Sequence, residues 1–312
     1  MSVLSIHNVS KHYREKSALL NVDLEIPKGS IYGLLGPNGA GKTSLIRIIN
    51  QITAPDTGYI ELESQKLHPN HIKQIGYLPE ERGLYRKMKV GEQALYLAQL
   101  KGMDKHDAHS KLKEWFTKFD MVPWWNKKVE ELSKGMQQKV QFIVTIIHNP
   151  TLLIFDEPFT GFDPINTNLI KDELLKLSEE GKTIILSTHR MESVEELCSH
   201  IALINNAEKI IDGSVNDIRK SFKGRSYEID YKGNSIAFAN ALWTGAKLES
   251  NEQVNEHMRA VVELPEGGST NNLLSQLLPH IEILNFKEKI PSMNEIFISL
   301  VEDDLEKEEA SE

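Results

Sequence analysis

The 312-residue chain has a single cysteine, Cys198, which excludes an intrachain disulfide and fits a reducing compartment. No apolar run approaches the roughly 20 residues that a membrane-spanning helix needs. The N-terminal residues lack the charged start and apolar stretch of a secretory signal. The sequence also shows no concentrated basic stripe, so we expect no nucleic-acid partner. These absences predict a cytoplasmic protein.

The net charge of −9 is concentrated at the C-terminal end of the chain. Seven acidic residues against one lysine follow Val301. A charge run of this kind with little apolar content is usually solvated, and we expect residues 304–312 to form an acidic disordered tail.

Short apolar runs bounded by turn signals recur in the first two hundred residues. They are 31–35 (IYGLL), 75–78 (IGYL), 152–155 (LLIF) and 183–186 (TIIL). These runs lack polar alternation, which is typical of strands buried on both faces of a parallel sheet. Longer helical patterns, such as 107–119 and 136–148, lie between them. The alternation predicts an α/β domain over residues 1–219, with a helical region at about 84–150.

The pattern changes after Asp212-Gly213. From Ser226 it predicts strand, helix (235–243), strand (246–250), strand (257–264), helix (271–278) and strand (281–286). This βαββαβ order is the ferredoxin-like split unit. A last helix is expected from Pro291, because proline suits a first helical turn. We therefore expect a small α+β accessory domain over residues 220–303.

A phosphate-binding loop follows the first predicted parallel strand. Residues 36–43 (GPNGAGKT) fit GxxxxGK[ST] and open an apolar helix. Glycines let backbone N–H groups surround an oxyanion, and the helix N-terminus adds partial positive charge. Lys42 is expected to reach the β/γ-phosphates and Thr43 to bind Mg²⁺. A glycine-rich turn without a ligand is the alternative, which the strand before and the helix after disfavour.

Acidic residues end the third predicted strand. Asp156 is expected to hold the magnesium shell, and Glu157 to polarise water in line with the γ-phosphate. His189 follows the next strand, where a lone histidine is more often structural. Ligands of open parallel sheets bind beyond the carboxyl ends of the strands. We therefore expect Lys42, Glu80, Asp156, Glu157 and His189 to meet in one crevice, because each of them follows a predicted strand.

The order of these motifs resembles the ABC ATPases over roughly residues 2–215. The most class-specific element is 132–137 (LSKGMQ), which is similar to the family's LSGGQ signature, although Ser133 could simply cap the following helix. Segments 55–58 (PDTG), 161–163 (GFD) and 187–189 (STH) resemble the turn into a small antiparallel sheet, the D-loop and the switch-histidine segment. Residues 79–85 (PEERGLY), Glu80 and Met136 at positions where the family usually has glutamine, and the C-terminal PSMNEIF resemble the branch containing sodium-efflux and other ABC-2-type exporter ATPases.

The resemblance implies a P-loop NTPase fold and ATP hydrolysis with Mg²⁺, in a head-to-tail dimer, homo- or heteromeric, that drives an integral membrane permease. The chain would then lie on the inner face of the cell membrane. The resemblance and the P-loop together assign an ATP site to Tyr13 (adenine stacking), Gly36, Pro37, Asn38, Gly39, Ala40, Gly41, Lys42, Thr43, Ser44, Ser133, Gly135, Met136 and Asp163. The expected metal ligands are Thr43, Glu80 and Asp156, and the expected catalytic residues are Lys42, Glu157 and His189.

Two departures from the family pattern matter for the site. Glu80 stands where the family usually has glutamine, and Met136 stands at the last position of the signature. An ionised glutamate only accepts hydrogen bonds, whereas glutamine also donates. Two other functions stay open from sequence: a non-transport ABC ATPase acting on a macromolecular partner, and a regulatory or dimerising role centred on the C-terminal domain.

Overall fold

The computed structural model describes residues 2–14, 16–81, 83–242 and 245–309. The chain divides into two compact units, Met1–Val215 and Asn216–Glu312, a few residues before the boundary expected at 219/220. Each unit has a hydrophobic core of its own. No helix in the described part of the chain is both long and apolar enough to cross a membrane.

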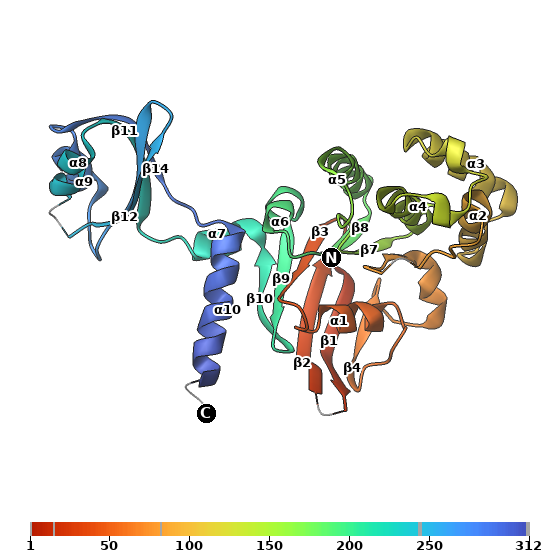
Figure 1. Cartoon of the computed structure of the whole chain (residues 1–312). Helices are drawn as coiled ribbons and strands as arrows, with labels where there is room; N and C mark the ends of the chain where they lie inside the picture. Colours follow the sequence, from red (N-terminus) through yellow and green to blue (C-terminus); the bar gives the residue numbers. More distant parts are fainter. Residues whose placement is uncertain (1, 15, 82, 243–244, 310–312) are drawn as a thin grey trace. The chain divides into compact units, whose positions relative to one another are not determined.

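The first unit is built on a six-stranded sheet with the order β10-β9-β3-β8-β7-β6 (Figure 1). Strands β9, β3, β8, β7 and β6 are parallel, and β10 pairs antiparallel with β9. Every residue of β3, β7 and β8 is buried, as their unbroken apolar runs predict. The strand bounds are β3 Ile31–Leu35, β6 Ile75–Leu78, β7 Leu152–Asp156, β8 Thr183–Ser187, β9 His200–Asn205 and β10 Glu208–Ser214.

A second sheet, with the order β2-β1-β4-β5, is entirely antiparallel. Helix α1 (Lys42–Ile49) lies between the two sheets, and its apolar face shares one core with both of them. The turn at 55–58 leads into this sheet: a Cβ on Gly58 (φ +78°) would lie 2.3 Å from the His7 carbonyl oxygen, so only glycine fits there. The bounds are β1 Ser2–Tyr13, β2 Lys16–Pro27, β4 Thr57–Leu62 and β5 Gln65–Lys66.

Helices α2 (Val90–Leu100), α3 (Lys105–Lys118) and α4 (Lys134–Ile146) form the helical region expected at 84–150. Its aromatic core reaches the parallel sheet: Phe119 packs on Phe142, whose ring stacks on Phe155 of β7 at 5.5 Å. Helices α5 and α6 lie on one side of that sheet (Figure 1). The remaining helical segments are η1 Pro69–Gln74, η2 Val122–Trp124, η3 Val129–Glu131, α5 Pro164–Glu179, α6 Met191–Leu197 and α7 Val215–Ser221, which spans the division between the units.

The second unit has the predicted split βαββαβ topology. Its sheet has the order β12-β13-β11-β14 with every pair antiparallel, and α8 and α9 pack on it through a core that includes Tyr231 and Phe238. The bounds are β11 Ser226–Gly233, α8 Ser235–Ala241, β12 Lys247–Val254, β13 His257–Glu263, α9 Thr270–Leu277, β14 Ile281–Glu288 and α10 Met293–Glu309. The end of the predicted helix 235–243, at Trp243, lies outside the described residues.

The C-terminal helix corrects one expectation. Helix α10 continues to Glu309, so residues 304–309 of the segment expected to be disordered are helical. Leucine, glutamate and lysine dominate this stretch, and all three have high helix propensity, so a helix that begins in the apolar segment at Met293 can continue through it. Residues 310–312 lie outside the described part of the chain.

Candidate nucleotide-binding site

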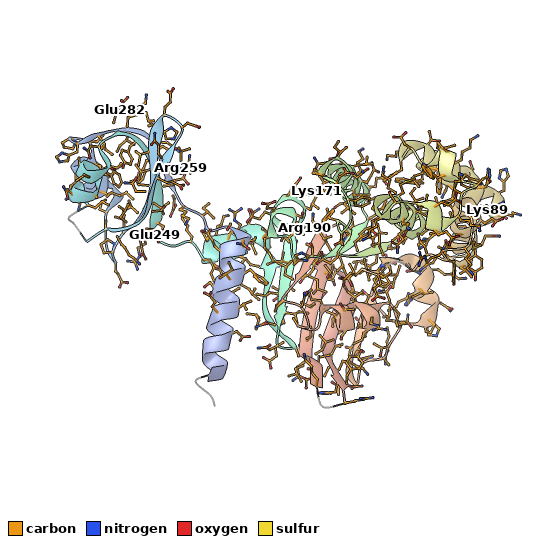
Figure 2. All side chains as sticks on the ribbon, in the orientation of Figure 1. Lys89, Lys171, Arg190, Glu249, Arg259 and Glu282 are labelled. Atoms are coloured by element: carbon orange, nitrogen blue, oxygen red, sulfur yellow. The ribbon has the colours of Figure 1, made fainter. Side chains whose placement is uncertain are left out.

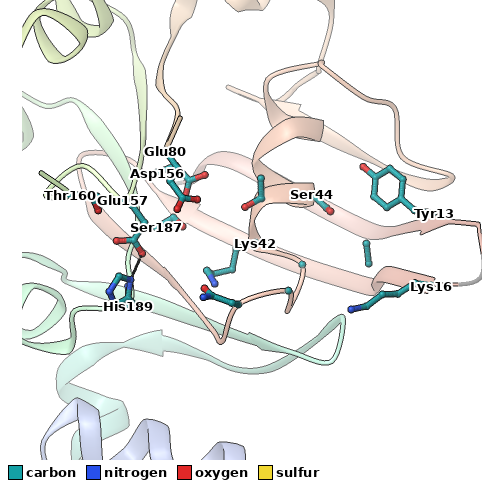
Figure 3. Close-up of a pocket in the computed structure, with 15 residues that line it drawn as sticks. Tyr13, Lys16, Lys42, Ser44, Glu80, Asp156, Glu157, Thr160, Ser187 and His189 are labelled. Atoms are coloured by element: carbon teal, nitrogen blue, oxygen red, sulfur yellow. Dashed lines mark hydrogen bonds and ion pairs between the residues drawn. The ribbon is translucent and has the colours of Figure 1, made fainter. Parts of the chain in front are cut away.

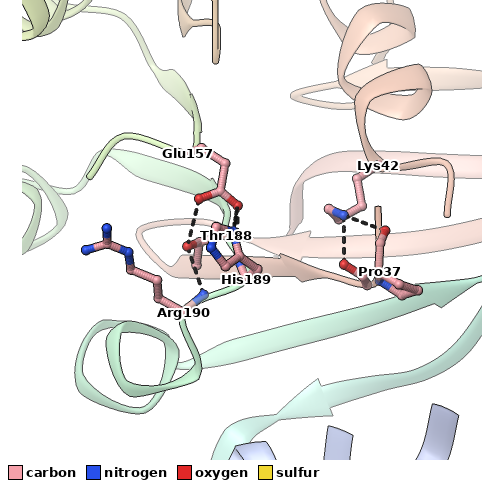
Figure 4. Close-up of polar contacts among 7 residues, drawn as sticks. Pro37, Lys42, Glu157, Thr188, His189 and Arg190 are labelled. Carbon is pink, nitrogen blue, oxygen red and sulfur yellow. Dashed lines mark hydrogen bonds and ion pairs between the residues drawn. The ribbon is translucent and has the colours of Figure 1, made fainter. Parts of the chain in front are cut away.

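The loop between β3 and α1 has the conformation that its glycines allow. Gly36 (φ +147°) and Gly41 (φ +122°) approach neighbouring backbone so closely that a Cβ would lie 2.1 Å from the Ile204 carbonyl oxygen and 2.3 Å from the Ala18 carbonyl oxygen, respectively. The Lys42 Nζ donates to the carbonyl oxygens of Gly36 (2.7 Å) and Pro37 (2.9 Å), across the loop (Figure 4). The loop is thus closed around a cradle next to the N-terminus of α1.

A cleft of about 640 Å³ opens at this loop (Figure 3). It brings together eleven of the residues predicted from sequence: Tyr13, Asn38, Gly39, Gly41, Lys42, Thr43, Ser44, Glu80, Asp156, Glu157 and His189. Gly36, Pro37 and Ala40 belong to the same loop but do not line the cleft. Tyr13 lies at the end of β1 with 44% of its surface exposed, so its ring is accessible for stacking.

Glu157 and His189 form a hydrogen-bonded pair across neighbouring strand ends. The His189 Nδ1 lies 2.8 Å from Glu157 Oε1, which also accepts the His189 backbone N–H at 2.9 Å (Figure 4). Since an ionised carboxylate only accepts, Nδ1 carries the hydrogen in this pair. Thr188 donates to the second carboxylate oxygen at 3.3 Å. Glu157 has φ +49°, a conformation that costs energy for a residue with a Cβ and is concentrated at functional sites.

Charge in the cleft is concentrated on a few groups. Burial lowers the pKa of the Lys42 ammonium, and the carboxylates of Glu157, Asp156 and Glu80 oppose that change. Burial raises the pKa of the Asp156 carboxyl, and the negative charges of Glu80 and Glu157 add to the effect. The Lys42 ammonium therefore lies near three acidic side chains, and a cation bound among them would relieve their repulsion.

The donor set fits Mg²⁺. Among the described residues, no group of three or more His, Cys, Asp or Glu side chains could hold a metal. Thr43, Asp156 and Glu80 nevertheless offer a hydroxyl and two carboxylates to the cleft, and the side chains of Glu80 and Asp156 lie close together (Figure 3). Magnesium is typically bound by one or two carboxylates together with substrate phosphates and waters, not by a cage of protein ligands. These three residues would hold the ion only together with a bound nucleotide.

Four predicted residues lie away from the cleft. Ser133 caps α4 by accepting the Met136 N–H at 3.3 Å, and Asp163 caps α5 by accepting the Asn166 N–H at 2.9 Å. Gly135 lies next to the carbonyl oxygen of Gly161: a Cβ at position 135 would be 3.5 Å from that oxygen. The signature segment and the D-loop thus lie side by side, and neither contributes a lining residue to the cleft of its own chain.

The cleft also contains residues that the sequence analysis missed. Lys16, Thr160 and Ser187 line it, and Thr188 donates a hydrogen bond to the Glu157 carboxylate. Ser187 and Thr188 directly precede His189 in the chain, so their position next to a predicted site residue could have indicated that they belong to the site. Lys16 begins β2 and enters the cleft only because β1 and β2 pair, with Tyr13 opposite Lys16. No local motif marks such a pairing.

Known proteins share these features. The sequence profile of the ABC transporter family matches residues 19–160, and that of an ATP-binding protein DrrA1-3-like C-terminal domain matches residues 213–301. The ABC transporter ATP-binding protein YhaQ of Bacillus subtilis (strain 168), itself uncharacterized, is 37% identical over 303 residues, which cover 96% of this chain and 98% of the relative. The Nod factor export ATP-binding protein I of Burkholderia lata is 33% identical over 221 residues, which cover 70% of this chain and 73% of the relative.

A solved ATP-binding subunit of an ABC transporter superimposes with a TM-score of 0.66 at 28% identity, covering 71% of this chain and 93% of that structure. The chain belongs to the ABC transporter ATP-binding proteins. It is an ATPase that binds ATP, and its second unit matches the C-terminal domain of DrrA1-3-like ATP-binding proteins, as the resemblance to the ABC-2-type exporter branch predicts.

Proposed function

We propose that two copies of this chain close head to tail on ATP and hydrolyse it to drive export through a separate membrane permease. The observation that carries the dimer is the position of the signature segment. Its Ser133 and Gly135 offer a helix N-terminus suited to phosphate, yet they do not line the cleft that holds the P-loop. A second copy supplies the missing half if its signature faces this P-loop.

Within the composite site, the residues of the cleft have different roles. Lys42 and the loop N–H groups hold the β- and γ-phosphates, and Tyr13 stacks on the base. Glu157 accepts a hydrogen from the attacking water and orients it, while Thr188 and the His189 N–H fix its carboxylate. His189 contacts the γ-phosphate. Thr43, Asp156 and Glu80 would hold Mg²⁺, which would neutralise charge on the phosphoryl group when bound.

Glu157→Gln tests the catalytic assignment. The amide keeps the size of the side chain but removes the carboxylate that orients and polarises water, so turnover should fall by roughly 10²–10⁴-fold. ATP binding should be preserved, and the stalled protein should elute as a dimer in gel filtration with MgATP. Thr160→Ser, a conservative change in the same cleft, is the control. Rapid hydrolysis by Glu157→Gln would remove the general-base role.

The permease contact is assigned to a groove between α2, α4 and the segment after β6. This α2–α4 groove, of about 290 Å³, is lined mainly by apolar side chains, including Leu84, Leu97, Leu100 and Val144. Pro79 and Gly83 belong to its wall, so the groove adjoins Glu80 of the nucleotide cleft. A partner segment seated there would respond to closure around ATP. The direction, export, is proposed from the similarity to the Nod factor export ATP-binding protein.

Leu97→Asp with Leu100→Asp tests this contact. Two carboxylates in an apolar groove are costly to bury, so co-purification with the permease should be lost while the basal ATPase of the isolated subunit is retained. Leu175→Asp on α5, where the leucine is also partly exposed, is the matched control. Undiminished co-purification of the double variant would place the permease elsewhere.

A further inference from the structure

A basic surface forms where two distant segments of the helical region pair. Residues 86–90 and 127–130 are joined by backbone hydrogen bonds: Val90 N–H to the Lys127 carbonyl (2.9 Å), Val129 N–H to the Met88 carbonyl (3.0 Å) and Glu130 N–H to the Arg86 carbonyl (3.0 Å). The pairing gathers five cationic side chains, which we call the basic ridge: Arg86, Lys87, Lys89, Lys127 and Lys128. All five are exposed.

The geometry of this pairing keeps the cations on the surface. Val90 and Val129 are buried, at 0% and 1% exposure, and anchor the two segments to the core. Lys89 and Lys128 are directly opposite each other in an antiparallel bridge, so both side chains lie on the same face. Lys89 lies at the edge of the helical region, beside α2 and α3 (Figure 2).

The ridge is only partly neutralised. Lys127 pairs with Glu131 at 3.3 Å and Lys128 with Glu130 at 3.8 Å, both on exposed side chains. Within the described part of the chain, no ion pair involves Arg86, Lys87 or Lys89. Like charges directly opposite each other in a ladder are destabilising, and Glu130 compensates only Lys128 of the Lys89–Lys128 pair within the described part of the chain. The chain as a whole carries −9, so this surface has the opposite sign to the molecule.

Aromatic side chains border the ridge. Tyr85, adjacent to Arg86, is 58% exposed, and its ring centroid lies 6.5 Å from that of Tyr96, which is 43% exposed. Tyrosine next to lysine and arginine is the composition of protein surfaces at the membrane–water interface, where amphipathic rings lie at the headgroup level. Tyr85 and Tyr96 are near Leu84 and Leu97 in the chain, so the ridge adjoins the α2–α4 groove proposed for the permease.

We propose that the basic ridge binds the anionic lipid headgroups of the membrane in which the permease lies. The inference rests on the proposed function, because the permease would hold the α2–α4 groove at the membrane. In a cluster of four or more lysines and arginines beside a membrane, each residue strengthens binding roughly fivefold through the negative surface potential of the leaflet. The ridge would orient the ATPase against the bilayer independently of nucleotide.

The test uses the full chain without the permease. Co-sedimentation is measured with two kinds of vesicle, one of phosphatidylcholine alone and one that also contains about 30 mol% phosphatidylserine. Each is tested at low and at high salt. We expect binding only to the anionic vesicles, weakened by salt because the ridge is exposed. The variant Arg86→Gln, Lys87→Gln, Lys89→Gln should bind on the order of 100-fold more weakly. Lys89 makes no side-chain cap for α2, so the variant should fold.

A second triple variant, Lys28→Gln, Lys66→Gln, Lys111→Gln, removes the same charge from exposed positions on separate elements and should bind anionic vesicles like the wild type. Basal ATPase activity should be unchanged in both variants, since none of these residues lines the nucleotide cleft. Equal binding of the ridge variant and the wild type, or equal binding to neutral and anionic vesicles, overturns the proposal. If the ridge variant instead loses the permease while binding vesicles normally, an acidic permease segment is the partner. A failure of the proposed function appears separately, as the absence both of an MgATP-dependent dimer and of permease co-purification with the wild type.

Discussion

Glu80 is the residue whose chemistry departs most from the family pattern. It lines the cleft together with Asp156 and Glu157, and its charge contributes to the raised pKa of the Asp156 carboxyl. Three carboxylates beside bound phosphates repel one another and the nucleotide unless a divalent cation lies among them. This chain should therefore depend on Mg²⁺ more strongly than a chain with a neutral amide at position 80.

Glu80→Gln should separate two effects of the Glu80 carboxylate: its repulsion of the phosphates and its attraction of Mg²⁺. With one carboxylate fewer near the phosphates, metal-free ATP should bind about fivefold more tightly, a change of about 1 kcal/mol. The Mg²⁺ concentration for half-maximal turnover should rise by a similar factor, because a ligand is weakened. The pKa of Asp156 should fall with the loss of its neighbour, which shifts the acid limb of the pH–rate profile to lower pH. ATP binding in EDTA and a Mg²⁺ titration of activity measure these effects.

The neighbouring acid provides the control for that experiment. Glu81 lies in an adjoining hollow with Glu80 but does not line the nucleotide cleft. Glu81→Gln changes the net charge equally, so it should leave both the metal dependence and the acid limb near their wild-type values. If both variants behave alike, the effect belongs to net charge and not to a ligand at position 80.

At the scale of elements, the sequence was sufficient for strands that are buried on both faces. The runs 31–35, 75–78, 152–155 and 183–186 are strands because a largely apolar run of four or five residues between turn signals has few other stable environments. The position of the site at one edge of the sheet also followed, since residues that come directly after parallel strands share that edge. The meeting of Lys42, Glu80, Asp156, Glu157 and His189 in one cleft needed only that rule.

The sequence patterns did not predict elements that depend on pairing between distant segments. Strands β1 and β2 are long and half-buried, and register shifts interrupt their pairing, so no steady alternation marks them. The position of Lys16 in the cleft depends on that pairing. The basic ridge has the same origin: its two segments are about forty residues apart in the chain, and each alone contains only two or three cations.

The junction of α2, α4 and β6 carries a prediction about pH. The carbonyl of Ile75 lies 3.3 Å from His148 Nε2 and accepts from Lys101 Nζ at 2.8 Å. Burial, together with the charge of Lys101, lowers the pKa of His148 from 6.5 to about 4. The unfolded chain therefore takes up a proton on this histidine below pH 6.5, and the folded chain does so only near pH 4. Stability should decline by up to about 3 kcal/mol as the pH falls through this window.

Urea unfolding at pH 7 and at pH 4.5 measures this decline. His148→Gln keeps a donor for the Ile75 carbonyl but cannot titrate, so the difference in unfolding free energy between the two pH values should shrink. His106→Gln changes a histidine on α3 whose side chain is 94% exposed, and it should leave the difference unchanged. An unaltered difference in the His148 variant would assign the acid sensitivity to other groups.

At the scale of the whole molecule, the chain contains two separate hydrophobic cores. One includes β1, α1 and the parallel sheet, and the other includes β11, β13, α8 and α9. The nucleotide cleft is lined only by residues of the first unit. Cooperative unfolding follows a shared core, and a ligand stabilises the unit that binds it. The two units should therefore unfold in separate transitions that respond differently to nucleotide.

Scanning calorimetry of the full chain can resolve these transitions. With MgATP at about a hundredfold excess over its dissociation constant, the first unit should gain about 2.7 kcal/mol, and only its transition should move to higher temperature. The Glu157→Gln variant is suited to this experiment because it should bind ATP without consuming it. Lys42→Ala, which removes the phosphate-binding ammonium, should abolish the shift. If a single transition moves as a whole, the second unit is energetically coupled to the nucleotide site, and the regulatory role for residues 216–309 becomes the stronger hypothesis.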